Sequence, residues 1–131
     1  MRSVRAFAPA TIANLSYGFD CLGVSLDSLG DEVEMSFNNS EEIEIISIEN
    51  NSGIPLDSNR NCCAEVVRKM NQRLQSKHGV SIRIKKGFQS GSGLGSSSAS
   101  SAAAALAYNN LLDNPFSLNE LIPFAAFGEK L

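Results

Sequence analysis

The chain has 131 residues, of which 43% are hydrophobic and 19% are charged, and its net charge is −3. This length suits a single domain with a hydrophobic core. The negative charge argues against a general nucleic-acid-binding or membrane-surface protein, because both need a basic face. No apolar run approaches the roughly 20 residues that a membrane span requires.

The cysteines and the N-terminal residues favour a cytoplasmic protein. Arg2 and Arg5 are not followed by the apolar segment of a signal peptide. Cys21, Cys62 and Cys63 are odd in number and lack metal-ligand spacing. We therefore interpret the adjacent pair as small core residues and expect a reducing compartment.

The first part of the chain predicts strands. Residues 2–15 read as extended structure that bends or lies at an edge at Pro9, because proline has no N–H for a strand ladder. Alternating apolar residues predict separate strands at 22–26 and 33–37, the latter with one solvated face. Residues 42–48 predict another strand, whose apolar phase slips between Ile45 and Ile46. This slip indicates a bulge or burial on both faces.

A helix and a further strand follow. Residues 57–59 offer N-caps for a helix in which apolar side chains recur every four residues from Cys62 to Leu74. We expect Gly79 to end it, with Lys77 and a solvated His78 at its negative end. Residues 80–84 alternate as a strand.

Two more helices complete the predicted order. The alanine-rich residues 96–112 predict a long helix, and Ser117 with Glu120 forms a capping-box signal for a last helix, which Pro123 should kink or split. Strands, helix, strand, helix, helix is the order of an α+β domain. We predict a two-layer sandwich, with helices on one face of a mixed sheet.

The most informative segment is Gly91-Ser-Gly-Leu-Gly-Ser-Ser-Ser98, directly before the alanine-rich helix. Glycines let the backbone approach a ligand closely, and a helix start offers unpaired N–H groups and the positive end of the helix dipole. The segment therefore predicts a phosphate-binding loop. It is not a Walker P-loop, because no Gly-Lys-Ser/Thr closes it. The alternative is a Gly/Ser turn before a structural helix.

A second motif runs from Pro9 to Gly23 as Pro-Ala-Thr-Ile-Ala-Asn-Leu-Ser-Tyr-Gly-Phe-Asp-Cys-Leu-Gly. Together the two motifs resemble those of the GHMP kinases, and most of all the homoserine kinases among them. The residues that fit are Pro9, Ala10, Thr11, Ala13, Asn14, Gly18, Phe19, Asp20, Leu22 and Gly23 in the first motif, and Gly93, Leu94, Gly95, Ser96 and Ser97 in the second.

The resemblance covers nearly the whole chain but only the first part of the family. It implies that residues 1–131 are a truncated N-terminal ATP-binding domain, with a ribosomal-protein-like fold and without the C-terminal domain. The implied reaction is phosphorylation of the side-chain hydroxyl of L-homoserine by ATP with Mg²⁺, a step of threonine biosynthesis. We expect this fragment alone to turn over little or nothing.

The resemblance also implies nucleotide-site residues. The phosphates of ATP would lie on Gly91, Ser92, Gly93, Leu94, Gly95, Ser96, Ser97 and Ser98. Mg²⁺ would be held by Ser97 and by Glu129, the catalytic candidate, and Asn61 would lie in the adenine pocket. From residue type alone, Ser97 could instead be an N-cap, Glu129 an exposed glutamate and Asn61 a residue at a helix start.

For the substrate, the resemblance implies that Asp20 receives the homoserine ammonium and that Asn14 holds the molecule in register. The alternative is an Asx turn at Asn14 and a capping role for Asp20. Departures from the family motifs at Ile12, Ser16, Tyr17 and Gln89 bear on the substrate fit. Two other functions stay open: a GHMP kinase for a sugar or mevalonate-type substrate, and a non-catalytic binding module. A homo-oligomer stays open as well, because a missing partner domain would expose apolar surface.

Overall fold

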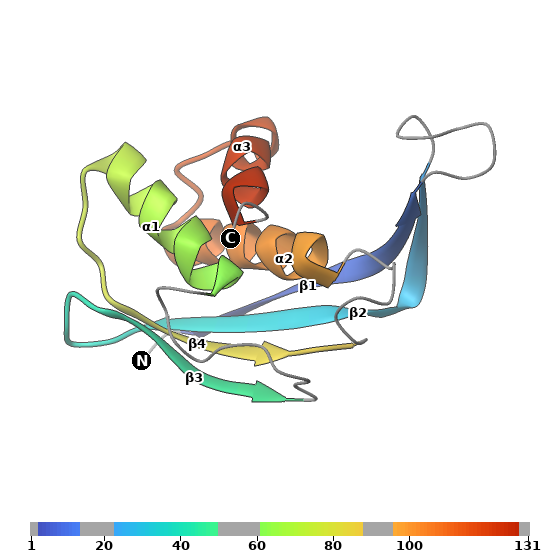
Figure 1. The fold of residues 1–131 in the computed structure, drawn as a ribbon. Helices are drawn as coiled ribbons and strands as arrows, with labels where there is room; N and C mark the ends of the chain where they lie inside the picture. The colour runs from blue at the N-terminus through green and yellow to red at the C-terminus, as the bar shows by residue number, and fades with distance from the viewer. Residues whose placement is uncertain (1–2, 14–22, 50–60, 88–95, 129–131) are drawn as a thin grey trace.

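The computed structural model describes residues 3–13, 23–49, 61–87 and 96–128 (Figure 1). Four strands and three helices lie in these ranges. They are β1 (Ser3–Ala13), β2 (Gly23–Phe37), β3 (Ile43–Glu49), α1 (Cys62–Leu74), β4 (Val80–Lys85), α2 (Ser96–Leu111) and α3 (Leu118–Gly128).

The strands form one mixed sheet in the order β1-β2-β4-β3. β1 and β4 pair with β2 in antiparallel fashion, whereas β3 and β4 are parallel. Parallel neighbours need a long crossover connection, and α1 lies in it. All three helices cover the same face of the sheet (Figure 1). The predicted α+β sandwich with a mixed sheet is therefore confirmed.

Strand irregularities fall close to where the sequence placed them. The register of β1 on β2 shifts between Pro9 and Ala10, and that of β3 on β4 shifts between Ile45 and Ser47. The predicted interruption and bulge are thus confirmed. The predicted separation of residues 22–26 and 33–37 into two strands is wrong, because β2 is one strand from Gly23 to Phe37. It pairs with β1 over residues 23–26 and again over residues 30–36.

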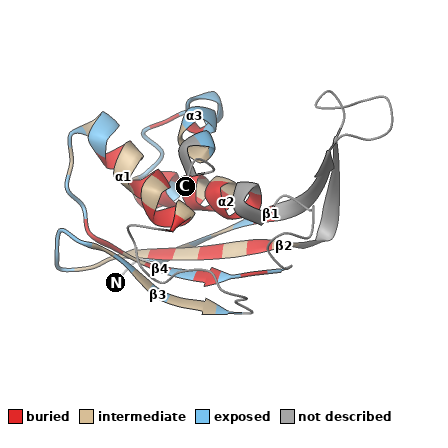
Figure 2. Ribbon diagram, in the orientation of Figure 1, coloured by how far each residue is buried: buried red, intermediate tan, exposed pale blue. Residues whose placement is uncertain are grey.

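The core lies between the helices and the sheet. Alternate residues of β2 and β4 point into it, which gives the bands of Figure 2. Its fully buried side chains include Val33, Met35, Val66, Val67, Met70, Val80, Ile82, Ala103, Ala104, Ala107 and Tyr108. Small alanines on α2 let this helix lie close to β1 and β2, and burial of the larger side chains supplies the main stabilising term.

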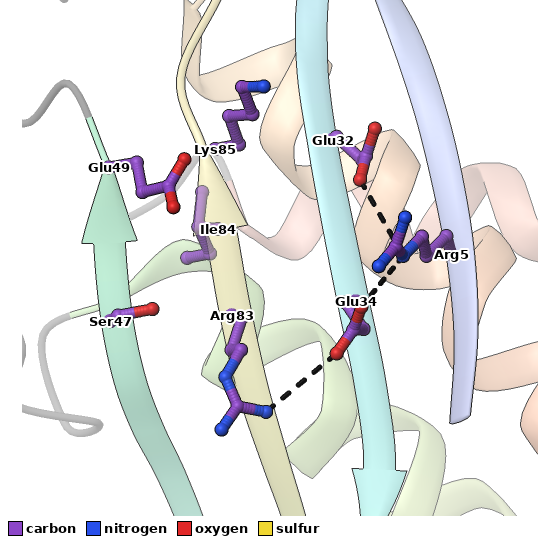
Figure 3. A pocket seen from close by; sticks show the side chains of 8 residues that line it. All are labelled: Arg5, Glu32, Glu34, Ser47, Glu49, Arg83, Ile84 and Lys85. Atoms are coloured by element: carbon purple, nitrogen blue, oxygen red, sulfur yellow. Dashed lines mark hydrogen bonds and ion pairs between the residues drawn. The ribbon is translucent and has the colours of Figure 1, made fainter. Parts of the chain in front are cut away.

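The outer face of the sheet is charged, as the solvated phase of residues 33–37 predicts. Figure 3 shows Arg5, Glu34 and Arg83 on three neighbouring strands. Glu34 lies between the two cations, with Arg5 Nε 2.7 Å from its Oε2 and Arg83 Nη1 3.7 Å from its Oε1. Such exposed pairs contribute little to stability, but they match opposite charges across the strands.

The ends of α1 differ from the prediction. Asn61 is the N-cap, accepting at Oδ1 from the amides of Cys63 (2.9 Å) and Ala64 (3.4 Å), and residues 57–59 lie outside the described residues. At the other end Gln75 adopts a left-handed conformation with φ of 54°, and the Ser76 amide donates to Asn71 O. This closes the helix four residues before Gly79.

Gly79 has another role. A Cβ there would lie 2.2 Å from Ser40 O and 2.3 Å from Asn38 Oδ1, so glycine permits a close approach of two chain segments. His78 lies past the helix, exposed as predicted, with its ring 5.1 Å from that of Phe37. The expected compensation of the helix dipole by His78 is therefore wrong.

The last two helices agree better with the sequence. α2 ends at Leu111, one residue before the predicted end. The capping box of α3 is confirmed: the Ser117 amide donates to Glu120 Oε1 (3.0 Å) and the Glu120 amide donates to Ser117 Oγ (3.3 Å). Pro123 does not split α3. It removes one donor to the Asn119 carbonyl, where both residues are exposed and water can replace it.

Candidate functional site

The glycine-rich segment connects β4 to α2. Gly91, Ser92, Gly93, Leu94 and Gly95 lie outside the described residues, whereas Ser96, Ser97 and Ser98 form the backbone of the first turn of α2. The predicted helix start after the glycines is confirmed. The first turn holds no acidic residue, so no carboxylate there competes with an anion for the amide groups.

Three other predicted site residues also lie outside the described residues: Asn14, Asp20 and Glu129. Their predicted roles in substrate and Mg²⁺ binding stay predictions. Hydroxyl and carboxylate oxygens, as on Ser97 and Glu129, are the donors that Mg²⁺ prefers. Within the described ranges, no three His, Cys, Asp or Glu side chains come together as a metal site.

Asn61 is described, and its position agrees with the structural alternative. It is 1% exposed and caps α1 through its side-chain oxygen. Capping satisfies two amide groups of the first turn, which is worth about 1 kcal/mol. A role in the adenine pocket stays a prediction beside this observed one.

A buried charged cluster lies next to the glycine-rich segment. It joins Asp31 of β2, Lys86 at the end of β4 and Ser100 of α2. Lys86 Nζ donates to Asp31 Oδ2 and to Ser100 Oγ (2.8 Å), and Ser100 Oγ donates to Asp31 Oδ2 (2.5 Å). The side chains of Lys86 and Asp31 are only 3% and 0% exposed. Charges this deeply buried must be paired, because an isolated ion loses its hydration.

The cluster continues into the backbone on either side. Asp31 Oδ1 accepts from the Gly87 amide (2.9 Å), and the Lys86 amide donates to Glu49 O (3.1 Å). The last residues described before the segment are thus fixed to β2 and β3.

Sequence reasoning missed this cluster, although a signal was present. Lys86 continues the buried phase of Val80, Ile82 and Ile84, and Asp31 continues that of Val33 and Met35. The register that sets Glu32 opposite Lys85 brings these two inward-facing residues of opposite charge together. A charged residue in each of two apolar phases could have predicted a buried ion pair.

The adjacent cysteines lie beside the cluster at the start of α1. Cys63 is buried as predicted, with its Sγ 3.5 Å from Ser100 O, whereas Cys62 is half-buried. The neighbouring Cys63 thiol, helped by the Ser101 hydroxyl and the Lys86 ammonium, lowers the pKa of Cys62 to about 7. The contact with Cys62 and burial raise the pKa of the Cys63 thiol well above its usual range.

A hydroxyl near these cysteines is poorly satisfied. Ser101 Oγ is buried without a hydrogen-bond partner in the described part of the chain. It lies near enough to Cys62 to help lower the pKa of that thiol, although the two side chains do not meet hydrogen-bond geometry. Ser101 is therefore unlike its neighbour Ser100, whose hydroxyl bonds to two charged groups.

Along the described ranges, no helix combines the length and apolar character that crossing a bilayer would need.

Comparison with known proteins places this fold. The family model described as "GHMP kinases N terminal domain" matches residues 61–131, more than half of the chain. The homoserine kinase of Chloroherpeton thalassium is 39% identical over 142 residues, covering 100% of this chain and 44% of that protein. The homoserine kinase of Xanthomonas campestris is 38% identical over 130 residues, covering 98% of this chain and 40% of that protein.

Solved structures agree. A crystal structure of homoserine kinase from Cytophaga hutchinsonii superposes with a TM-score of 0.94 at 39% identity, covering 98% of this chain and 41% of that one. Mevalonate kinase from Staphylococcus aureus shares the fold, with a TM-score of 0.70 at 18% identity. The match covers 99% of this chain and 45% of that one. The chain thus spans less than half the length of these relatives. With its fold, its motifs and the match over residues 61–131, the chain belongs to the GHMP kinase family.

Proposed function

We propose that the protein carrying this chain is a homoserine kinase, and that residues 1–131 form its N-terminal nucleotide-binding part. The observation that carries this proposal is the similarity to homoserine kinases along nearly the whole chain, at 39% identity and a TM-score of 0.94. The mevalonate kinase fold is similar at only 18% identity and a TM-score of 0.70.

In this proposal the segment from Gly91 to Ser98 holds the phosphates of ATP. The amides that start α2 carry no intrahelical bond of their own, and the absence of acidic residues from this turn favours an anion. Ser97 and Glu129 would hold Mg²⁺, which supplies positive charge against the phosphates. Asn61 would contact the adenine from the start of α1.

The acceptor would be the side-chain hydroxyl of L-homoserine. Asp20 binds its ammonium group and Asn14 orients it, so that the hydroxyl faces the γ-phosphate of ATP. Phosphoryl transfer depends mainly on alignment and charge neutralisation, and these residues supply the alignment. Cytoplasmic location, where ATP and amino acids are available, belongs to the same proposal.

An ADP-release assay on the complete gene product that carries this sequence tests the function. Homoserine, mevalonate, galactose and shikimate are compared as acceptors at saturating Mg·ATP. We expect turnover with homoserine alone, and loss of that turnover in Asp20→Asn. Turnover with another acceptor instead would reject the substrate assignment. Silence with all four, without Mg·ATP binding, would reject the kinase and favour a non-catalytic module.

A parallel assay uses residues 1–131 alone. The chain spans 44% or less of the curated homoserine kinases that it matches here, so we expect little or no ADP release from it. Homoserine-dependent turnover by this piece would show that the shorter chain holds a full active site. Sedimentation of the same sample reports whether it self-associates.

A further inference from the structure

We propose that Asp31 and Ser100 are positioning residues for nucleotide binding, and that Lys86 balances the charge of the buried Asp31 carboxylate. We call these three residues the loop anchor. It fixes Gly87, which precedes the glycine-rich segment, relative to α2, which follows it. The inference rests on the proposed function, because it takes the start of α2 as the phosphate site.

The geometry joins both ends of the segment through a single carboxylate. Asp31 Oδ1 accepts from the Gly87 amide (2.9 Å), while Oδ2 accepts from Ser100 Oγ (2.5 Å) and from Lys86 Nζ. Ser100 is the fifth residue of α2, one turn after its start. Asp31 itself belongs to β2, in the middle of the sheet order. The residue before the segment and the helix after it are therefore both held by the same strand residue, Asp31.

Gly87 is held by shape as well as by hydrogen bonding. A Cβ at this position would lie 1.7 Å from Gly30 O, because the two backbones touch. Only glycine fits such an approach. Gly30 directly precedes Asp31, so the same part of β2 sets both the carboxylate and the surface against which Gly87 packs.

The anchor acts by geometry and not by charge. Lys86 and Asp31 carry opposite charges in direct contact and are both buried. Replacing a buried ion pair by apolar residues of similar volume is often neutral for stability, so stability alone does not explain the pair. Apolar side chains cannot hold the Gly87 amide or the Ser100 hydroxyl in place, and directed hydrogen bonds can.

When both ends of the glycine-rich segment are already fixed, nucleotide binding has to order less of the chain, and this favours phosphate binding. A binding loop whose ends are already set loses less conformational freedom on binding, which increases affinity. The direction of α2, and with it the direction of its first amides, is set by the same contacts. Positioned amides are effective because they need no rearrangement around the anion.

Two double variants separate geometry from charge. In Asp31→Asn with Lys86→Met, the amide oxygen still accepts from Gly87 and the amide nitrogen donates to Ser100 Oγ, so the anchor survives without charge. In Asp31→Leu with Lys86→Met both bonds are lost. Two single variants provide a further comparison. Ser100→Ala removes a hydroxyl of the anchor, and Ser101→Ala is its matched control, because the Ser101 hydroxyl is buried on the same helix without a partner in the described ranges.

Calorimetric titration of each complete gene product with Mg·ATP gives the Kd and the number of sites. We expect Asp31→Leu with Lys86→Met to raise the Kd at least tenfold, and Ser100→Ala to raise it at least threefold. The asparagine–methionine double variant and Ser101→Ala should stay within threefold of the parent. The KM for ATP should follow the Kd, while the KM for homoserine stays unchanged.

The measured Kd values and site numbers distinguish a positioning role of the anchor from a structural role and from a role for its charge. A merely structural role would lower the number of folded binding sites and leave the Kd unchanged, and that result overturns the proposal. Equal weakening in both double variants would show a role for charge and overturn it too. If the leucine variant does not fold, the comparison of Ser100→Ala with Ser101→Ala decides alone. Parent protein without any Mg·ATP binding would refute the proposed function itself, which none of the other outcomes does.

Discussion

Replacing Lys86 alone should destabilise the chain far more than replacing Lys86 and Asp31 together. Lys86→Met leaves the Asp31 carboxylate, 0% exposed, without its cation. Breaking a buried ion pair from one side costs about 3–5 kcal/mol, because an uncompensated charge stays in the interior. With an unfolding entropy of about 2.1 cal/mol/K per residue, this corresponds to a Tm lower by about 11–18 °C for a chain of this length.

Adding Asp31→Asn removes the uncompensated charge. The amide side chain that this substitution introduces can still accept from the Gly87 amide and can donate to Ser100 Oγ, so the second substitution should restore stability to within about 1 kcal/mol of the parent. The coupling energy between the two substitutions should therefore exceed about 2 kcal/mol, above the additivity error of about 0.5 kcal/mol.

Urea unfolding of the parent, both single variants and the double variant, followed by circular dichroism, measures this coupling. Equal slopes with urea concentration would show that the same surface is exposed in all four proteins. A loss below about 1 kcal/mol in Lys86→Met would refute the reasoning, since it would mean that water reaches the carboxylate. A double variant no more stable than the weaker single variant would refute it as well.

Three further predictions concern other parts of the fold. Because the pKa of Cys62 is lowered to about 7, its thiolate forms at a lower pH than that of an ordinary cysteine. The rate of its alkylation by iodoacetamide, followed by peptide mass spectrometry, should therefore rise as the pH passes about 7. A rate that rises only near about pH 9 would contradict the stabilised thiolate. Burial raises the pKa of Tyr108 to about 12, so its contribution to stability is complete below pH 10 and is lost as the pH rises through 12. Ultraviolet titration should show it ionising after a free tyrosine, and ionisation near pH 10 in the folded chain would count against its burial. Gly79→Ala should destabilise by at least about 2 kcal/mol in urea unfolding, since its Cβ would overlap Ser40 O, and an unchanged midpoint would mean that the turn yields freely.

Local pattern was enough to predict much of the fold. The alternation of Val33 and Met35 with glutamates gave the buried and solvated faces of β2, and the phase slip at Ile46 gave the bulge of β3. Ser117 and Glu120 specified the start of α3 by themselves, because a capping box involves only neighbours in sequence.

Features that depend on distant contacts escaped this reasoning. Gly79 carries the usual sign of a helix end, yet it is needed where the chain approaches residues 38–42. The anchor joins residues 55 and 69 positions apart, and no short motif marks such a triad. The roles of Asn14, Asp20 and Glu129 came from family resemblance, whereas the phosphate-binding role of the glycines came from local pattern; all of these residues lie outside the described ranges.

The bulge in β3 also bears on how readily the edge of the sheet could pair with a strand of another molecule. Among the described strands β3 is an outer one, so its outer edge offers backbone groups to which a strand of another molecule could pair. The extra residue Ile46 interrupts the regular ladder, and exposed glutamates at positions 44 and 49 add like charges along the same strand. A foreign strand therefore meets both a broken spacing of donors and acceptors and electrostatic repulsion. The irregularity costs one pairing step within the fold and makes strand addition along this edge less favourable.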